Sequence, residues 1–141
     1  MKRGIIALFA LMMFASCGNN ATTKNEENGC CSTETKATTA GTVEVLYMHG
    51  KQRCATCIAI GKEAKAFVDG LGNDKVVMKT IDFSTPAGEK IADKYEIANS
   101  SLIIVKDGKV ENLTSMAFRH ARNNPAQFKK SLGESIQNML K

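Results

Sequence analysis

The sequence predicts an α/β domain in which a central, four-stranded mixed sheet is flanked by helices. Three observations lead to this prediction. Apolar β-branched runs alternate with segments of helical period, the first helix has a short connection to the next strand, and an Asp-Gly turn joins two late strands. With 141 residues, 43% of them hydrophobic, the chain is long enough for one small domain with appendages. The expected order of elements is β-α-β-α-β-β-α.

The first strand and the first helix are separated by two closely spaced cysteines. Val43–Met48 is an apolar run typical of a buried strand, and a polar turn, residues 49–53, follows it. Next comes the motif Cys54-Ala55-Thr56-Cys57. After the motif, apolar residues recur with helical period at Ile60, Ala64 and Phe67. We therefore expect Cys54 at or near a helix N-terminus.

The second strand and second helix come next. Val76–Asp82 predicts a strand, and its short connection to the preceding helix implies a right-handed unit with parallel pairing. Thr85 and Pro86 predict a helix start, because threonine caps a helix and proline suits its first position. Asn99 is the expected stop. The buried side of this helix is expected at Ile91 and Tyr95.

A hairpin and a final helix complete the domain. Leu102–Val105 is an apolar strand, Asp107-Gly108 is a strong hairpin turn, and Lys109–Thr114 is expected to return as an antiparallel partner. Asn124-Pro125 opens the last helix. Its apolar residues repeat every four positions and are expected to pack on the sheet: Phe128, Leu132, Ile136 and Leu140.

The placement of the two cysteines has chemical meaning. The thiolate is the nucleophilic form of cysteine, and a helix N-terminus stabilises an anion through its unpaired N–H groups and partial positive charge. Arg53 and Lys51 lie next to Cys54 and act in the same direction. Cys54 is therefore the expected attacking thiol and Cys57 the resolving thiol. A metal site and a disulfide that never turns over remain open alternatives for the same motif.

In this context of strand, turn, CATC and helix, the sequence resembles the thioredoxin-like superfamily, over roughly residues 42–141. The resemblance implies a thioredoxin-like fold and a thiol–disulfide oxidoreductase that uses no organic cofactor. Its partners would be protein dithiols or disulfides, among them an integral membrane reductase. We expect a monomer. The formal charge of +5 is too mild and too dispersed to favour nucleic-acid binding.

The chain departs from the family at the position before the third strand. The family usually carries a cis-proline there, which helps to seat an extended substrate chain and keeps metals off the dithiol. Ser100 occupies this position. A cis bond before a residue other than proline costs about 2.5–4 kcal/mol, so a trans peptide is expected. The difference favours an alternative function, in which Cys54 and Cys57 bind a soft metal or metalloid with His49 or the Cys30-Cys31 pair.

The buried acid that is common on the family's first strand is also missing, since Leu46 and Met48 occupy the candidate positions. His49 is the nearest titratable group for proton transfer to Cys57, and packing or capping of the turn is its alternative role. His120 is expected in a solvated basic loop, although family loops after the fourth strand lie near the dithiol.

The N-terminal part predicts export and anchoring. Residues 1–16 have a basic start and a short apolar stretch, as in a signal peptide. Phe14-Ala15-Ser16-Cys17 resembles a bacterial lipoprotein cleavage box, which implies a lipidated Cys17 and a periplasm-facing, membrane-anchored protein of the cell envelope. Ordinary secretion with a free Cys17 is the alternative. Residues 17–41 are the expected lipidated cysteine and disordered tether, and residues 42–141 the domain.

A second cysteine pair, Cys30-Cys31, interrupts the polar tether. It is a candidate auxiliary dithiol that exchanges with Cys54 and Cys57 or helps to bind a soft metal. An incidental pair without a function is the alternative. The sequence does not decide how the cysteines pair.

Overall fold

The structure is a computed structural model, and it describes residues 40–141. These residues form one four-stranded sheet with the strand order β2-β1-β3-β4, flanked by helices. The elements in chain order are β1 (Val43–His49), α1 (Ala55–Leu71), β2 (Val76–Asp82), α2 (Pro86–Lys94), β3 (Ser101–Lys106), β4 (Lys109–Asn112), α3 (Thr114–His120) and α4 (Pro125–Leu140). The predicted α/β class and mixed sheet are confirmed.

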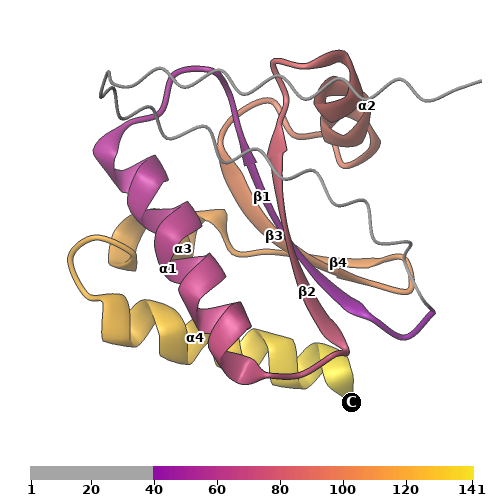
Figure 1. The fold of residues 1–141 in the computed structure, drawn as a ribbon, viewed down its shortest axis with the longest axis vertical. Coiled ribbons are helices and arrows are strands. Elements are labelled where there is room, and N and C mark those ends of the chain that lie inside the picture. The colour runs from indigo at the N-terminus through magenta and orange to yellow at the C-terminus, as the bar shows by residue number, and fades with distance from the viewer. Residues whose placement is uncertain (1–39) are drawn as a thin grey trace, which may run out of the picture. The chain divides into compact units, whose positions relative to one another are not determined.

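The pairing of β1 sets where the cysteine motif emerges. This strand pairs with β2 in parallel and with β3 in antiparallel orientation, so it lies inside the sheet (Figure 1). Its last residues stand opposite the end of β2 and the start of β3, with His49 beside Asp82 and Met48 beside Ser101. One end of the sheet therefore holds the end of β1, the start of β3 and the chain that leads to Cys54.

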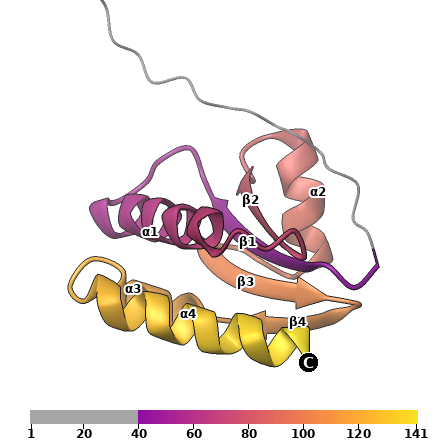
Figure 2. The same ribbon diagram turned by 60° about the horizontal axis from the view of Figure 1, so that its bottom comes forward.

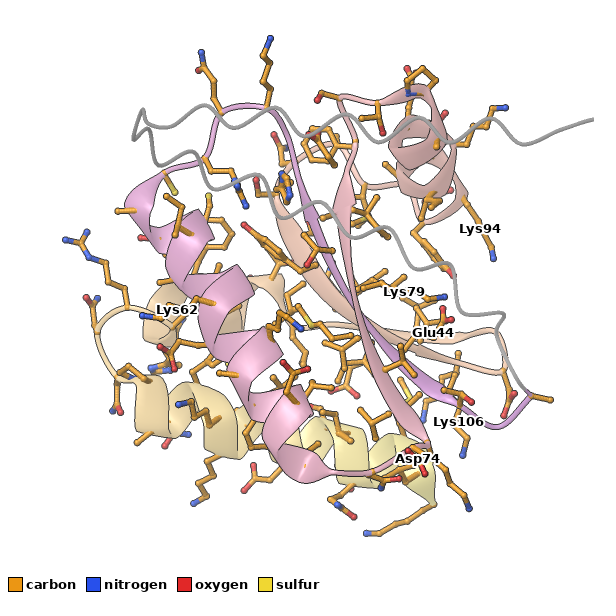
Figure 3. All side chains as sticks on the ribbon, in the orientation of Figure 1. Glu44, Lys62, Asp74, Lys79, Lys94 and Lys106 are labelled. Carbon is orange, nitrogen blue, oxygen red and sulfur yellow. The ribbon has the colours of Figure 1, made fainter. Side chains whose placement is uncertain are left out.

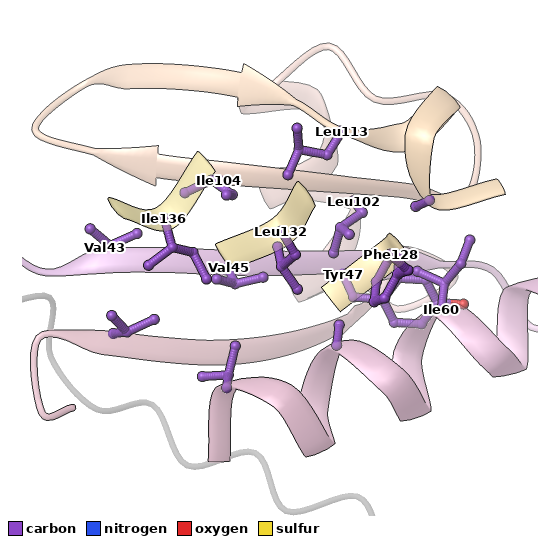
Figure 4. Close-up of a cluster of buried hydrophobic side chains, with 14 of the residues drawn as sticks. Val43, Val45, Tyr47, Ile60, Leu102, Ile104, Leu113, Phe128, Leu132 and Ile136 are labelled. Carbon is purple, nitrogen blue, oxygen red and sulfur yellow. The ribbon is translucent and has the colours of Figure 1, made fainter. Parts of the chain in front are cut away.

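The two faces of the sheet have separate apolar clusters. One face packs against α1, α3 and α4, in a cluster that includes Val45, Tyr47 and Phe128 (Figure 4). The other face packs against α2, in a smaller cluster that includes Leu46 and Met48. Figure 2 shows α2 and α4 on opposite sides of the sheet. The alternation along β1 explains this division, because successive side chains of a strand point to opposite faces.

The structure agrees with the predicted helix starts. The side chain of Thr85 accepts the N–H of Gly88 at the start of α2, and that of Asn124 accepts the N–H of Gln127 at the start of α4. In α4 three of the four predicted apolar residues are buried, namely Phe128, Leu132 and Ile136. The fourth, Leu140, is only partly buried, and its neighbour Met139 is buried in the core.

Three predictions about the later elements are corrected. The second helix ends at Lys94 instead of Asn99, because Glu96 adopts a left-handed backbone with φ of 54°. The last strand ends at Asn112 instead of Thr114. The segment predicted as a basic loop contains the end of an additional helix, α3, of which His120 is the last residue.

An acidic residue lies among the buried side chains of β1. Glu44 is 8% exposed, and its carboxylate receives Lys79 Nζ from the adjacent strand β2 at 2.5 Å (Figure 3). A carboxylate this deep requires a charged partner, and the ion pair supplies one. Among the helices of residues 40–141, none combines the length and apolar composition needed to cross a membrane.

Candidate functional site

The cysteine motif lies where the chain leaves β1 and enters α1. Cys54 is the N-cap of α1 and has an extended backbone, with φ of −75° and ψ of 164°. Its side chain therefore lies at the helix N-terminus, as the sequence predicts, and it is exposed. Cys57 lies in the first turn of the same helix and is buried. Both are free thiols, so the site is described in its reduced form.

The two thiols are in direct contact. Their Sγ atoms lie 2.7 Å apart, and the backbone N–H of Cys57 donates to Cys54 Sγ at 3.2 Å. The hydrogen bond from the Cys57 thiol, followed by that from its backbone N–H, lowers the pKa of Cys54 below the ordinary cysteine value. A disulfide has an S–S length of about 2.05 Å, so closing the bond requires only a small movement of the side chains.

A tyrosine lies beneath the motif. Tyr47 is 1% exposed, and its hydroxyl donates to the backbone carbonyl of Cys57 at 2.5 Å. Burial, followed by the nearby Cys57 charge, raises the pKa of Tyr47 to about 12. The hydroxyl therefore stays protonated at neutral pH and remains a hydrogen-bond donor.

Two further predicted site residues, Arg53 and His49, lie near the same end of the sheet as the cysteines. His49 ends β1, and Arg53 directly precedes Cys54. Arg53 is exposed, and its positive charge favours the ionised forms of Tyr47 and Asp82. His49 is buried, its Nδ1 lies 2.9 Å from the carbonyl oxygen of Gly50, and its ring lies 5.5 Å from the ring of Tyr47. His49 therefore has the packing and turn contacts of its alternative role, and it adjoins the tyrosine that contacts Cys57.

Asp82 is a charged neighbour of this site that the sequence did not single out. It stands opposite His49 in the sheet register. Its carboxylate accepts the hydroxyl of Ser84 at 2.6 Å, and this bond is the main cause that lowers the pKa of Asp82, with smaller contributions from the charges of His49 and Arg53.

Ser100 lies directly before β3, at the position where the sequence departs from the thioredoxin-like pattern. All peptide bonds in the described part of the chain are trans, including the bond before Ser100, so the expected trans peptide is confirmed. The next residue, Ser101, is buried and donates its hydroxyl to the carbonyl of Asn99 at 2.8 Å. The backbone turn at this point is thus held by a serine side chain instead of a proline ring.

The remaining predicted site residues, Cys17, Cys30 and Cys31, lie outside the described residues. Within residues 40–141, no group of three or more His, Cys, Asp and Glu side chains is gathered as a metal site. His120 ends α3, where its backbone carbonyl accepts the N–H of Asn124.

Comparison with solved structures identifies the fold. The chain is similar to a structure described as that of a malarial protein, at 20% identity and a TM-score of 0.51, over 71% of this chain and 99% of that chain. It is similar to Fasciola hepatica thioredoxin, also at 20% identity and 0.51, over 71% and 83%. The first thioredoxin domain of mouse protein disulfide-isomerase A4 matches at 14% identity and 0.50, over 70% and 64%.

These likenesses define the class of fold, which is thioredoxin-like. No family model matches the chain, and no curated protein matches it.

The sequence pattern identifies the cysteine motif but does not show the contact that Tyr47 makes with it. The pattern places Tyr47 only in a buried strand. It alternates with Val43 and Val45 on the side of β1 that faces the main cluster. One signal was available. Gly61 lies in the helix interior, four residues after Cys57, and a glycine at such a position often has a packing reason.

Proposed function

We propose that this protein is a thiol–disulfide oxidoreductase that exchanges electrons with protein dithiols through Cys54 and Cys57. One observation carries the proposal: an exposed thiol of lowered pKa caps a helix, and a buried thiol lies 2.7 Å behind it. An exposed thiolate is accessible to a partner's disulfide, whereas a shielded second thiol reacts only after the first has been modified.

The exchange proceeds in two steps. The Cys54 thiolate attacks one sulfur of the partner's disulfide, a Cys54–partner disulfide forms, and the partner's other sulfur leaves as a thiolate. Cys57 then loses its proton and attacks Cys54 Sγ, which closes the Cys54–Cys57 disulfide and releases the second partner sulfur as a thiolate. The partner gains two electrons, and the proton from Cys57 and protons from water convert its thiolates to thiols. Electron flow in the other direction follows the same steps in reverse.

Arg53 and His49 have supporting roles in this proposal. The Arg53 guanidinium adds positive potential around the exposed thiolate. His49 is the candidate acceptor for the Cys57 proton, which would reach it through water. Both residues contact Tyr47, His49 through its ring and Cys57 through its backbone carbonyl.

The proposal extends to the location of the protein. A lipid on Cys17 and the polar segment to residue 41 would hold the domain at a periplasm-facing membrane of the cell envelope. There it would meet other envelope proteins, including an integral membrane reductase, and Cys30-Cys31 would act as an auxiliary dithiol. The support for this part is the sequence pattern of residues 1–17.

The exchange reaction is tested by trapping its intermediate. The full chain with Cys57→Ser is incubated with a model peptide that is closed by one disulfide, and the Cys54→Ser chain is the matched control. Without the resolving thiol, the Cys57→Ser chain should accumulate a mixed disulfide that mass spectrometry of its proteolytic fragments locates at Cys54. An adduct yield at this site no higher than that of wild type, whose resolving thiol is intact, would overturn the proposal.

A further inference from the structure

The contacts of Tyr47 extend the site beyond the two cysteines. A buried tyrosine hydroxyl normally finds a hydrogen-bond partner. Here the partner is the carbonyl of Cys57, at 2.5 Å. The rest of the ring lies in the main apolar cluster near Ile60 and Phe128 (Figure 4), so packing around strand β1 places the hydroxyl at the first turn of α1.

This contact completes a set of three that hold Cys57. Its backbone N–H donates to Cys54 Sγ, its own Sγ lies against Cys54 Sγ, and its carbonyl accepts the hydroxyl of Tyr47. The first two contacts lower the pKa of Cys54. The third is the only one of the three that comes from outside the Cys54–Cys57 motif, and it ties the cysteine pair to strand β1.

Helix α1 leaves room for the ring of Tyr47 at Gly61. A Cβ atom at Gly61 would lie 2.7 Å from Tyr47 Cε1, closer than carbon atoms approach, and 3.0 Å from its Cδ1. Glycine within a helix destabilises it relative to alanine, so a glycine at this position needs a structural reason. The absence of a side chain at residue 61 is therefore what lets the tyrosine reach the carbonyl of Cys57.

We propose that Tyr47 is a positioning residue of the dithiol, which holds Cys57 so that its N–H and thiol face Cys54. Loss of the hydroxyl leaves the first turn of α1 free to shift and weakens both contacts to Cys54 Sγ. Because these contacts stabilise the reduced, thiolate-bearing form, their loss makes the dithiol harder to keep reduced. The consequence for exchange with a partner rests on the proposed function, whereas the effect on the thiols does not.

The test compares three full-length variants with the wild type. Tyr47→Phe removes only the hydroxyl, and Gly61→Ala retains it but displaces the ring. Tyr95→Phe is the matched control, since Tyr95 packs against the cluster on the other face of the sheet. Two quantities are measured at the Cys54–Cys57 pair: the equilibrium with glutathione and the rate of Cys54 alkylation by iodoacetamide at pH 6.

We expect Tyr47→Phe to change the equilibrium constant about threefold to tenfold toward the disulfide, which lowers the midpoint potential by about 14–30 mV. The alkylation rate should fall by a similar factor, because less Cys54 is ionised at this pH. Gly61→Ala should shift both quantities in the same direction, and Tyr95→Phe should leave both unchanged.

A folded Tyr47→Phe variant with a lower melting temperature but wild-type values of both quantities would overturn the inference, because the tyrosine would then serve only the core. This result is distinct from failure of the proposed function. In that case the wild-type chain itself would fail in the trapping experiment, whatever the effect of Tyr47 on the thiols.

Discussion

At the residue scale, the two cysteines differ in exposure, and their chemistry should differ accordingly. Cys54 is exposed with a lowered pKa, and Cys57 is 6% exposed. We expect iodoacetamide to modify Cys54 first, with a pH midpoint below that of an ordinary cysteine. Mass spectrometry of the reduced chain across a pH series measures both rates.

The sign of this prediction follows from the hydrogen bonds. They stabilise the thiolate relative to the thiol, so the reactive form persists to lower pH than in an unfolded chain. The urea-unfolded chain is the control, in which both cysteines should react alike. Modification of Cys57 before Cys54, or a Cys54 midpoint at or above that of the unfolded chain, would contradict this account.

The position of Cys54 could be predicted from the local sequence around it. A strand pattern, a polar turn and a helical period fix the position of Cys54 at the helix N-terminus, because local sequence determines all three. The contact of Tyr47 with the carbonyl of Cys57 could not be predicted in this way. It depends on how closely α1 packs on β1, and only Gly61 hints at that distance.

At the scale of elements, the first three strands were predictable because each contains a short apolar run, and β4 was predictable because the Asp107-Gly108 turn precedes it. The second strand was predicted at its observed bounds, Val76–Asp82, and the others within two residues. The starts of α2 and α4 were equally clear, since each has a capping side chain followed by proline.

The additional helix α3 was missed for a physical reason. Its N-cap, Leu113, makes no side-chain capping bond, and the helix has only seven residues. A helix this short is not stable by itself and depends on tertiary packing. Here Ala117 and the adjoining Ala121 are buried in the main cluster, and the hydroxyl of Thr114 accepts the N–H of Leu102 on β3. None of these contacts has a local sequence signal.

At the scale of the whole molecule, the proposed lipid anchor gives a direct prediction. In a bacterial host, the wild-type chain should sediment with membranes and resist extraction by salt, because several acyl chains give stable anchoring. Cys17→Ser should move it to the soluble fraction. The control is Cys30→Ser, which should leave the distribution unchanged.

Detection of the chain in each fraction by immunoblot is the measurement. A wild-type chain recovered in the soluble fraction, or a Cys17→Ser chain that stays with the membranes, would contradict the anchor.

The central claim concerns the redox chemistry of Cys54 and Cys57. The most direct test is the midpoint potential of this pair in the purified full chain, measured in glutathione buffers by mass-tagging of free thiols, with peptide mapping to separate it from Cys30-Cys31. Metal content is recorded on the same sample.

We expect a reversible two-electron transition of metal-free protein between about −120 and −270 mV, the range of thiol-exchange proteins. A disulfide that stays closed well below about −300 mV would contradict the claim and favour a structural bond. A stoichiometric metal bound by these thiols would contradict it in favour of the soft-metal alternative.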